Sequence, residues 1–125
     1  MKKNNVRTVA VLGASGNPER YAYKAVERLK GDGYTVYPVH PELVSVLGIS
    51  AVPDLSKIPV PLDTVTVYLS AKRSTPLIPD IIRVKPSRVI LNPGAENPEL
   101  EKALDASGIP WLHACTLVLL GTGQF

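Results

Sequence analysis

Segment 9–18 constrains the fold of this chain more than any other stretch. Residues 9–12 are all aliphatic, as in a strand that is buried on both faces, and this run ends at Gly13. Asn17 then stands where a helix N-cap is expected and Pro18 in the first helical position, so we expect a helix from Pro18 to about Lys30. The turn between strand and helix directs free backbone N–H groups and the positive end of the helix dipole towards one point. The segment therefore predicts a site for a phosphate group.

Strands and helices alternate along the rest of the chain. After a first strand at Thr8–Leu12, further strands are expected at Thr35–Val39, 64–69, Arg88–Leu91 and 110–113. Helices are expected from Pro76 to about Lys85 and from Pro98, with Asn97 as cap, to Ser107-Gly108, which end the helix. Segment 42–62 is expected to be a loop with a helical turn near 55–58, and 116–120 is expected to be a short helix or strand. This alternation predicts a single domain over 1–125 of the α/β class: a Rossmann-like, doubly wound, mostly parallel sheet of about five strands with helices on both faces.

Ligands of such folds bind beyond the carboxyl ends of the strands, at the point where the strand order reverses. Four segments of this chain follow predicted strands, namely 13–23, 40–41, 69–73 and 92–94. We expect a ligand to contact these segments.

The composition excludes several classes of function. The 14 Lys and Arg residues outnumber the 11 Asp and Glu residues only slightly and are dispersed, which does not favour a nucleic-acid partner. No apolar run approaches the ~20 residues that cross a bilayer, and residues 1–5 lead into the first strand without a secretory signal, so no membrane partner is expected. Cys115 is the only cysteine, which excludes an internal disulfide and fits a cytoplasmic protein. His40 and His113 belong to no cluster with metal-ligand spacing, so we expect no metal site.

The turn at Gly13 matches neither of the two commonest nucleotide motifs. Ser15 and Pro18 occupy the second and third glycine positions of the dinucleotide fingerprint GxGxxG. An NAD site also needs a carboxylate at the end of the second strand, where this chain has His40, and Glu42 follows only after a proline. No GxxxxGK string followed by Ser or Thr occurs, which excludes a P-loop.

A series of short motifs runs along nearly the whole chain. They are Val11-Leu12-Gly13-Ala14-Ser15, Pro18-Glu19-Arg20, Tyr23, Gly33-Tyr34, Val39-His40-Pro41, Pro53-Asp54-Leu55 to Ile58-Pro59, the run Asn92-Pro93-Gly94-Ala95-Glu96-Asn97-Pro98-Glu99-Leu100, and Ala114-Cys115-Thr116-Leu117-Val118. In their order and spacing they resemble the stand-alone CoA-binding proteins, small Rossmann-like domains similar to the CoA-binding domain in the alpha subunit of succinyl-CoA synthetase. The last two runs resemble one subgroup of that family.

The resemblance implies a binding site, motif by motif. The turn from Gly13 to Pro18 would wrap a pyrophosphate, with Arg20 and Tyr23 beside it on the first helix. The turn after the second strand would flank the adenosine, and 69–71 with Arg73 would form the wall beyond the third strand. Segment 92–94 would line the thiol arm or only turn the chain. The expected ligand-binding residues are Gly13, Ala14, Ser15, Asn17, Pro18, Arg20, Tyr23, His40, Pro41, Leu69, Ser70, Arg73, Asn92, Pro93 and Gly94.

The expected function is non-catalytic binding of a small-molecule nucleotide, coenzyme A or an acyl-CoA. His40 has no partner carboxylate or nucleophile nearby in the sequence, and Cys115 is expected to be a small core residue, so no catalytic residue is assigned. Two alternatives stay open: a small NAD(P)-binding oxidoreductase, or a regulatory or interaction subunit with a vestigial pocket. A homo-oligomer or an enzyme partner is also left open. Since a side chain at Gly13 would fill the space of the diphosphate, Gly13→Val is expected to abolish binding in a folded domain.

Overall fold

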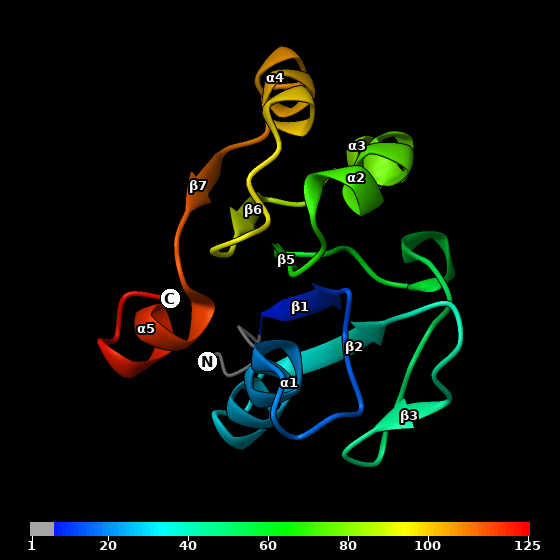
Figure 1. Ribbon diagram of the computed structural model, residues 1–125, viewed down its shortest axis with the longest axis vertical. Helices are drawn as coiled ribbons and strands as arrows, with labels where there is room; N and C mark the ends of the chain where they lie inside the picture. Colours follow the sequence, from blue (N-terminus) through cyan, green and yellow to red (C-terminus); the bar gives the residue numbers. More distant parts are fainter. Residues whose placement is uncertain (1–6) are drawn as a thin grey trace.

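A computed structural model describes residues 7–125, and the expectation about residues 1–5 lies outside them (Figure 1). The fold is a parallel, Rossmann-like α/β sheet, in the order β2-β1-β5-β6-β7. Its strands are β1 (Thr8–Leu12), β2 (Thr35–Val39), β5 (Thr64–Val67), β6 (Arg88–Leu91) and β7 (Trp111–His113). The predicted fold class is therefore confirmed, and the bounds of β1, β2 and β6 are those expected.

Helices cover both faces of the sheet (Figure 1). On one face lie α1 (Tyr21–Gly31) and α5 (Thr116–Gly121), and on the other α3 (Ile78–Val84) and α4 (Pro98–Ala106). Strand β1 serves both layers because its side chains alternate: Val9 and Val11 enter the cluster under α1, and Ala10 and Leu12 the cluster under α3 and α4. None of the helices within 7–125 has both the length and the apolar character needed to span a bilayer.

Helix α1 begins at Tyr21, so the prediction of a start at Pro18 is wrong. The side chain of Asn17 accepts a hydrogen bond from the Glu19 N–H at 3.0 Å, and the Arg20 N–H donates to the Asn17 carbonyl at 3.0 Å. These bonds close an exposed turn instead of capping a helix. Arg20 is the N-cap residue, and its side chain makes no capping hydrogen bond.

The helical segment after β5 begins earlier than expected. It comprises α2 (Ala71–Ser74), a 3-10 turn η3 (Thr75–Leu77) and α3, whereas the sequence predicted one helix from Pro76. The prolines at 76 and 79 lack N–H groups and interrupt the α-helical ladder, which accounts for the division into short pieces. Strand β5 accordingly ends at Val67 and not at 69, and 116–120 is helical.

Segment 42–62 contains a hairpin that the sequence did not predict. Strands β3 (Ser45–Val46) and β4 (Ile49–Ser50) pair antiparallel around Leu47 and Gly48, whose φ angles are +52° and +79°. Two positive φ angles are the geometry of a tight hairpin turn. The expected helical turn is present as η2 (Leu55–Lys57), where the Asp54 side chain accepts from the Ser56 N–H at 2.9 Å.

The chain reverses its direction of travel across the sheet at β1. Strand β2 lies on one side of β1 and β5 on the other, so the segments that leave the carboxyl ends of these strands diverge. A crevice opens where they part, as the doubly wound topology predicts.

Candidate ligand-binding site

The turn after β1 is held tightly against its neighbours. The N–H groups of Gly13 and Ala14 both donate to the Val39 carbonyl, each at 3.1 Å. Gly13 has a φ of +89°, and a Cβ atom there would lie 2.8 Å from Leu69 Cδ2. Glycine is therefore required at 13 for backbone conformation and for packing, and these two N–H groups serve the fold.

Other donors of the turn stay open. Within 7–125, the N–H groups of Ser15 and Gly16 and those of Tyr21, Ala22 and Tyr23 donate to no protein acceptor. The last three belong to the uncapped first turn of the 11-residue helix α1. Unpaired N–H groups at a helix N-terminus carry partial positive charge, which favours an anion.

A cleft of about 800 Å³ lies in front of this helix end. We call it the polar cleft; it is lined by residues 13–16, 19–22, 40, 43, 68–70, 73 and 93. Arg20 and Arg73 are its cationic residues, both are exposed, and neither forms an ion pair within the part of the chain that the structure describes. The cleft thus places two guanidinium groups with free charge beside the open end of α1.

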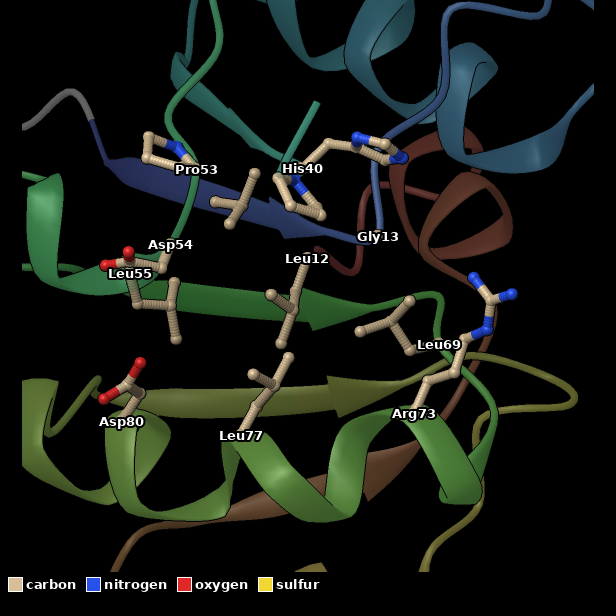
Figure 2. A pocket seen from close by; sticks show the side chains of 12 residues that line it. Leu12, Gly13, His40, Pro53, Asp54, Leu55, Leu69, Arg73, Leu77 and Asp80 are labelled. Carbon is tan, nitrogen blue, oxygen red and sulfur yellow. The ribbon is translucent and has the colours of Figure 1, made fainter. Parts of the chain in front are cut away.

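An apolar cavity of about 290 Å³ adjoins the polar cleft (Figure 2). Asp54 and Asp80 lie at one end of it, and the side chains of His40 and Arg73 lie at the other, near Gly13 (Figure 2). The Asp54 carboxyl accepts from the Ser56 hydroxyl and N–H, and these bonds hold its pKa below the usual range; Asp80 pairs with Arg83. The walls of the apolar cavity are formed by Leu12, Gly13, Val39, His40, Pro41, Pro53, Asp54, Leu55, Leu69, Arg73, Leu77 and Asp80.

His40 stands at the border between the two cavities. Its backbone N–H donates to the Val52 carbonyl at 3.0 Å, and its Nδ1 accepts from the Glu42 N–H at 3.0 Å. Because Nδ1 is the acceptor, the proton of the neutral ring is on Nε2. Gly13, His40, Leu69 and Arg73 line both cavities, which therefore form one continuous crevice.

The crevice brings together most of the residues singled out in the sequence. Gly13, Ala14, Ser15, Arg20, His40, Pro41, Leu69, Ser70, Arg73 and Pro93 line it. Asn17, Pro18, Tyr23, Asn92 and Gly94 lie outside its walls. Asn17 and Pro18 are exposed in the turn, and Tyr23 packs against the core under α1.

Several lining residues were not expected. Asp54 and Leu55 were visible in a motif of the chain but were given no role, although they form one end of the apolar cavity. Leu77 and Asp80 come from the helical segment, whose start was placed too late. Gly16 and Tyr68 line the polar cleft, and burial raises the pKa of Tyr68 to about 12.

Asn92 is part of the scaffold under the crevice. It is 1% exposed, and its Nδ2 donates to Thr66 Oγ1 at 2.7 Å and to the Val67 carbonyl at 2.9 Å. Its Oδ1 accepts from the Thr116 N–H at 2.8 Å, at the start of α5. The side chain thus ties β6 to β5 and α5.

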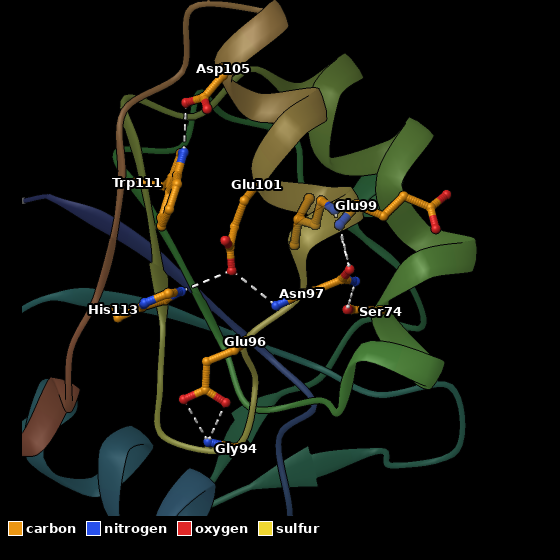
Figure 3. Close-up of polar contacts among 10 residues, drawn as sticks. Ser74, Gly94, Glu96, Asn97, Glu99, Glu101, Asp105, Trp111 and His113 are labelled. Carbon is orange, nitrogen blue, oxygen red and sulfur yellow. Dashed lines mark hydrogen bonds and ion pairs between the residues drawn. The ribbon is translucent and has the colours of Figure 1, made fainter.

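The segment after Asn92 is held by its own polar contacts (Figure 3). The Gly94 N–H donates to Glu96 Oε1 at 3.1 Å, and hydrogen bonds from the N–H groups of Glu96 and Gly94 lower the pKa of the Glu96 carboxyl. Asn97 caps α4: its Oδ1 accepts from the N–H groups of Glu99 and Leu100 at 3.1 and 3.2 Å. The predicted cap at Asn97 is confirmed.

Removing this cap is expected to weaken the fold. Asn97→Ala leaves two N–H groups of α4 and the buried Ser74 hydroxyl without their partner, so we expect a loss of about 2 kcal/mol in the free energy of unfolding. Urea denaturation followed by circular dichroism measures it. Asn17→Ala is the control, because Asn17 has the same following proline but is exposed and caps no helix; it should change stability by less than about 0.5 kcal/mol.

The chemistry that this crevice can perform is recognition of an anion next to an apolar group. Within the described residues, no three His, Cys, Asp or Glu side chains converge in a way that could hold a metal ion. The donors at the end of α1 and the two arginines suit a diphosphate, and the apolar cavity suits a flat aromatic group.

Comparison with known proteins gives one family and several relatives. Residues 7–121 match the family model described as the CoA binding domain. The uncharacterized protein YneT of Bacillus subtilis (strain 168) is 34% identical over 62 residues, which are 50% of this chain. The match covers only 46% of YneT.

Solved structures match over nearly the full chain. A crystal structure of an uncharacterized protein has a TM-score of 0.90 and 39% identity, and the match covers 96% of this chain and 98% of the other. The structure of cell-free ID.343 from Thermus thermophilus has a TM-score of 0.88 and 31% identity, with coverage of 98% and 92%. These proteins share the fold described above.

Proposed function

The chain belongs to the CoA binding domain family, and from that premise we propose that it binds coenzyme A or an acyl-CoA in the crevice beyond β1, β2 and β5. One observation carries the proposal: the uncapped end of α1 opens directly onto an apolar cavity, and Arg20 and Arg73 beside it form no ion pair with any residue of 7–125. The adenosine diphosphate part of coenzyme A has the matching groups: a flat base for the apolar cavity, a diphosphate for the end of α1, and a ribose between them.

The proposed pose follows from the charges of the two cavities. The adenine ring lies in the apolar cavity, with its exocyclic amine towards the carboxylates of Asp54 and Asp80. The diphosphate accepts from the N–H groups of the turn and of α1 and pairs with Arg20 and Arg73. The pantetheine arm then leads along the polar cleft past Ser70 and Pro93. The role proposed is binding, without a catalytic step, in the cytoplasm.

Calorimetric titration with coenzyme A tests this function. A ligand panel with acetyl-CoA, NAD, NADP and ATP, measured by thermal shift, identifies the preferred nucleotide, because a ligand stabilises the fold by RT ln(1 + [L]/Kd). We expect saturable binding of coenzyme A and a larger shift with it than with NAD or NADP. The absence of any shift at millimolar coenzyme A would refute the proposal, and a larger shift with NAD or NADP would replace it with the oxidoreductase alternative.

Arg73→Ala is expected to weaken binding of coenzyme A by about tenfold, since it removes a charged donor from both cavities. Titration calorimetry measures the change in Kd. Lys72→Ala is the matched control, because Lys72 precedes Arg73 on the same short helix, is exposed and lines neither cavity. The Lys72 variant should keep the affinity of the unmodified chain; equal losses in both variants would show that only net charge matters.

A further inference from the structure

The turn after β1 has fewer open donors than a phosphate-binding turn can offer. The Val39 carbonyl accepts from the N–H groups of both Gly13 and Ala14, each at 3.1 Å, so neither group is free for a ligand. The same two bonds hold the end of β2 against the turn, and the next residue after β2 is His40. The strand that takes up these two donors thus brings a side chain with a donor of its own to the same corner.

Hydrogen bonds fix the position of His40 and the place of its proton. Its backbone N–H donates to the Val52 carbonyl at 3.0 Å, and its Nδ1 accepts from the Glu42 N–H at 3.0 Å. Because Nδ1 is an acceptor, the neutral ring carries its proton on Nε2, and this N–H donates to no acceptor among residues 7–125. The half-buried ring therefore offers one open donor, at the atom that the loop bond determines.

The His40 ring lies at the end of the crevice where the polar cleft begins. His40 lines both cavities. Figure 2 shows its ring near Gly13, at the same end as the Arg73 guanidinium and at the other end from the carboxylates of Asp54 and Asp80. The next step rests on the proposed function, in which the base lies towards those carboxylates and the diphosphate towards α1. In that pose the ring is closer to the diphosphate than to the base.

We propose that His40 is a further binding residue for the diphosphate, and that its Nε2–H donates to a phosphate oxygen. The neutral imidazole serves for this, since a hydrogen bond to a charged acceptor is stronger than one between two neutral groups. Arg20 and Arg73 act from long, exposed side chains whose ordering costs conformational entropy, whereas His40 supplies a donor whose position is already fixed. His40 thereby takes the place of the two N–H groups of the turn that the fold uses.

Two substitutions separate the ring donor from the loop bond. His40→Asn keeps an acceptor for the Glu42 N–H, because an asparagine side chain bonds to the N–H two residues on, but its amide is too short to reach the position of Nε2. His40→Phe keeps a ring and loses both nitrogens. We expect each variant to bind coenzyme A about tenfold more weakly in titration calorimetry, since each removes a donor to a charged group. His113→Asn is the control, because His113 is exposed and lines neither cavity, and this variant should keep the affinity of the unmodified chain.

A second ligand and a second observable locate the contact. 3′-Dephospho-CoA lacks the phosphate on the ribose but keeps the diphosphate, so its affinity should fall by the same factor in His40→Asn. In phosphorus NMR of bound coenzyme A, this substitution should shift the diphosphate resonances and leave the 3′-phosphate resonance in place. All titrations are made below the onset of thermal unfolding of each variant, so that the affinity is that of folded protein.

The results distinguish this inference from the function on which it rests. An affinity that falls in His40→Phe but not in His40→Asn would show that His40 acts through its bond to the Glu42 N–H, and would overturn the inference. A loss confined to coenzyme A would place the ring on the 3′-phosphate and overturn it as well, as would unchanged affinity in both variants. The proposed function would stand in each of these cases. If the unmodified chain binds neither ligand at millimolar concentration, the proposed function fails and the inference fails with it.

Discussion

Gly13→Val is expected to lower the free energy of unfolding by about 2–6 kcal/mol. Position 13 has a φ of +89°, which a β-branched residue adopts only under strain of about 1–3 kcal/mol. The new Cβ would also lie 2.8 and 2.9 Å from two atoms of the Leu69 side chain, and such overpacking adds about 1–3 kcal/mol. Equilibrium denaturation by urea measures the loss. The structure therefore predicts that this variant loses stability in addition to the ligand binding that the sequence analysis expected it to lose.

Gly16→Val separates binding from stability. A Cβ at 16 has Leu43 Cδ2 at 3.8 Å as its nearest heavy atom, which is ordinary contact, and the position lines the polar cleft. We expect less than about 1 kcal/mol of destabilisation and at least a tenfold loss of affinity for coenzyme A, since the side chain would occupy the space beside an open N–H group. Unchanged affinity in the Gly16 variant would place the diphosphate away from this turn, and full stability of the Gly13 variant would contradict the packing argument.

Asn92→Ala should cost about 4 kcal/mol of stability, because it removes three buried hydrogen bonds and leaves the buried Thr116 N–H without a partner. The Thr116 N–H and the Val67 carbonyl each lose a short hydrogen bond, as does the Thr66 hydroxyl, in a region that water does not reach. Thermal and urea unfolding measure the loss, which should exceed that of Asn97→Ala. A change of less than 1 kcal/mol would show that the site relaxes around the missing amide.

The same variant tests the role that the motif implied for Asn92. Titration with coenzyme A at a temperature where the variant is fully folded gives the affinity apart from the stability. An unchanged Kd would leave Asn92 as a scaffold residue alone. A weaker Kd would show that its position also sets the shape of the crevice.

Two segments with the same local signal show how far the sequence predicts the helices. Asn17-Pro18-Glu19 and Asn97-Pro98-Glu99 both match a cap followed by a first helical turn, yet only the second begins a helix. The two segments differ in the residue that follows them. Leu100 is fully buried in the core and anchors the first turn of α4, whereas Arg20 is charged and exposed. Tertiary packing is therefore what selects between two equal local preferences.

The strands were predicted more accurately because their apolar runs carry the signal directly. Strands β1 and β6 are buried on both faces and flanked by turn residues, and their bounds follow from composition alone. The hairpin of β3 and β4 has strands of only two residues each and a leucine at a positive φ. Strands this short show no alternation of apolar and polar residues, so the sequence does not predict the hairpin.

The crevice was predicted in part. Residues from each of the four segments that follow strands line the crevice, because the topology brings the carboxyl ends of the strands together; their contact with a ligand stays a prediction. The sequence predicted free N–H groups in the turn without saying which residues carry them. The Val39 carbonyl accepts from those of Gly13 and Ala14, and this pairing with the neighbouring strand is not visible in a single sequence.

Strand β1 couples the two hydrophobic layers of the molecule. Val9 and Val11 belong to one hydrophobic layer, and Ala10 and Leu12 belong to the other. Because both layers pack on the same strand, we expect them to unfold together. The crevice begins where this shared backbone ends, at Gly13. A ligand bound in the crevice would stabilise both layers. Its binding is therefore expected to slow amide hydrogen exchange in α4 as well as in α1.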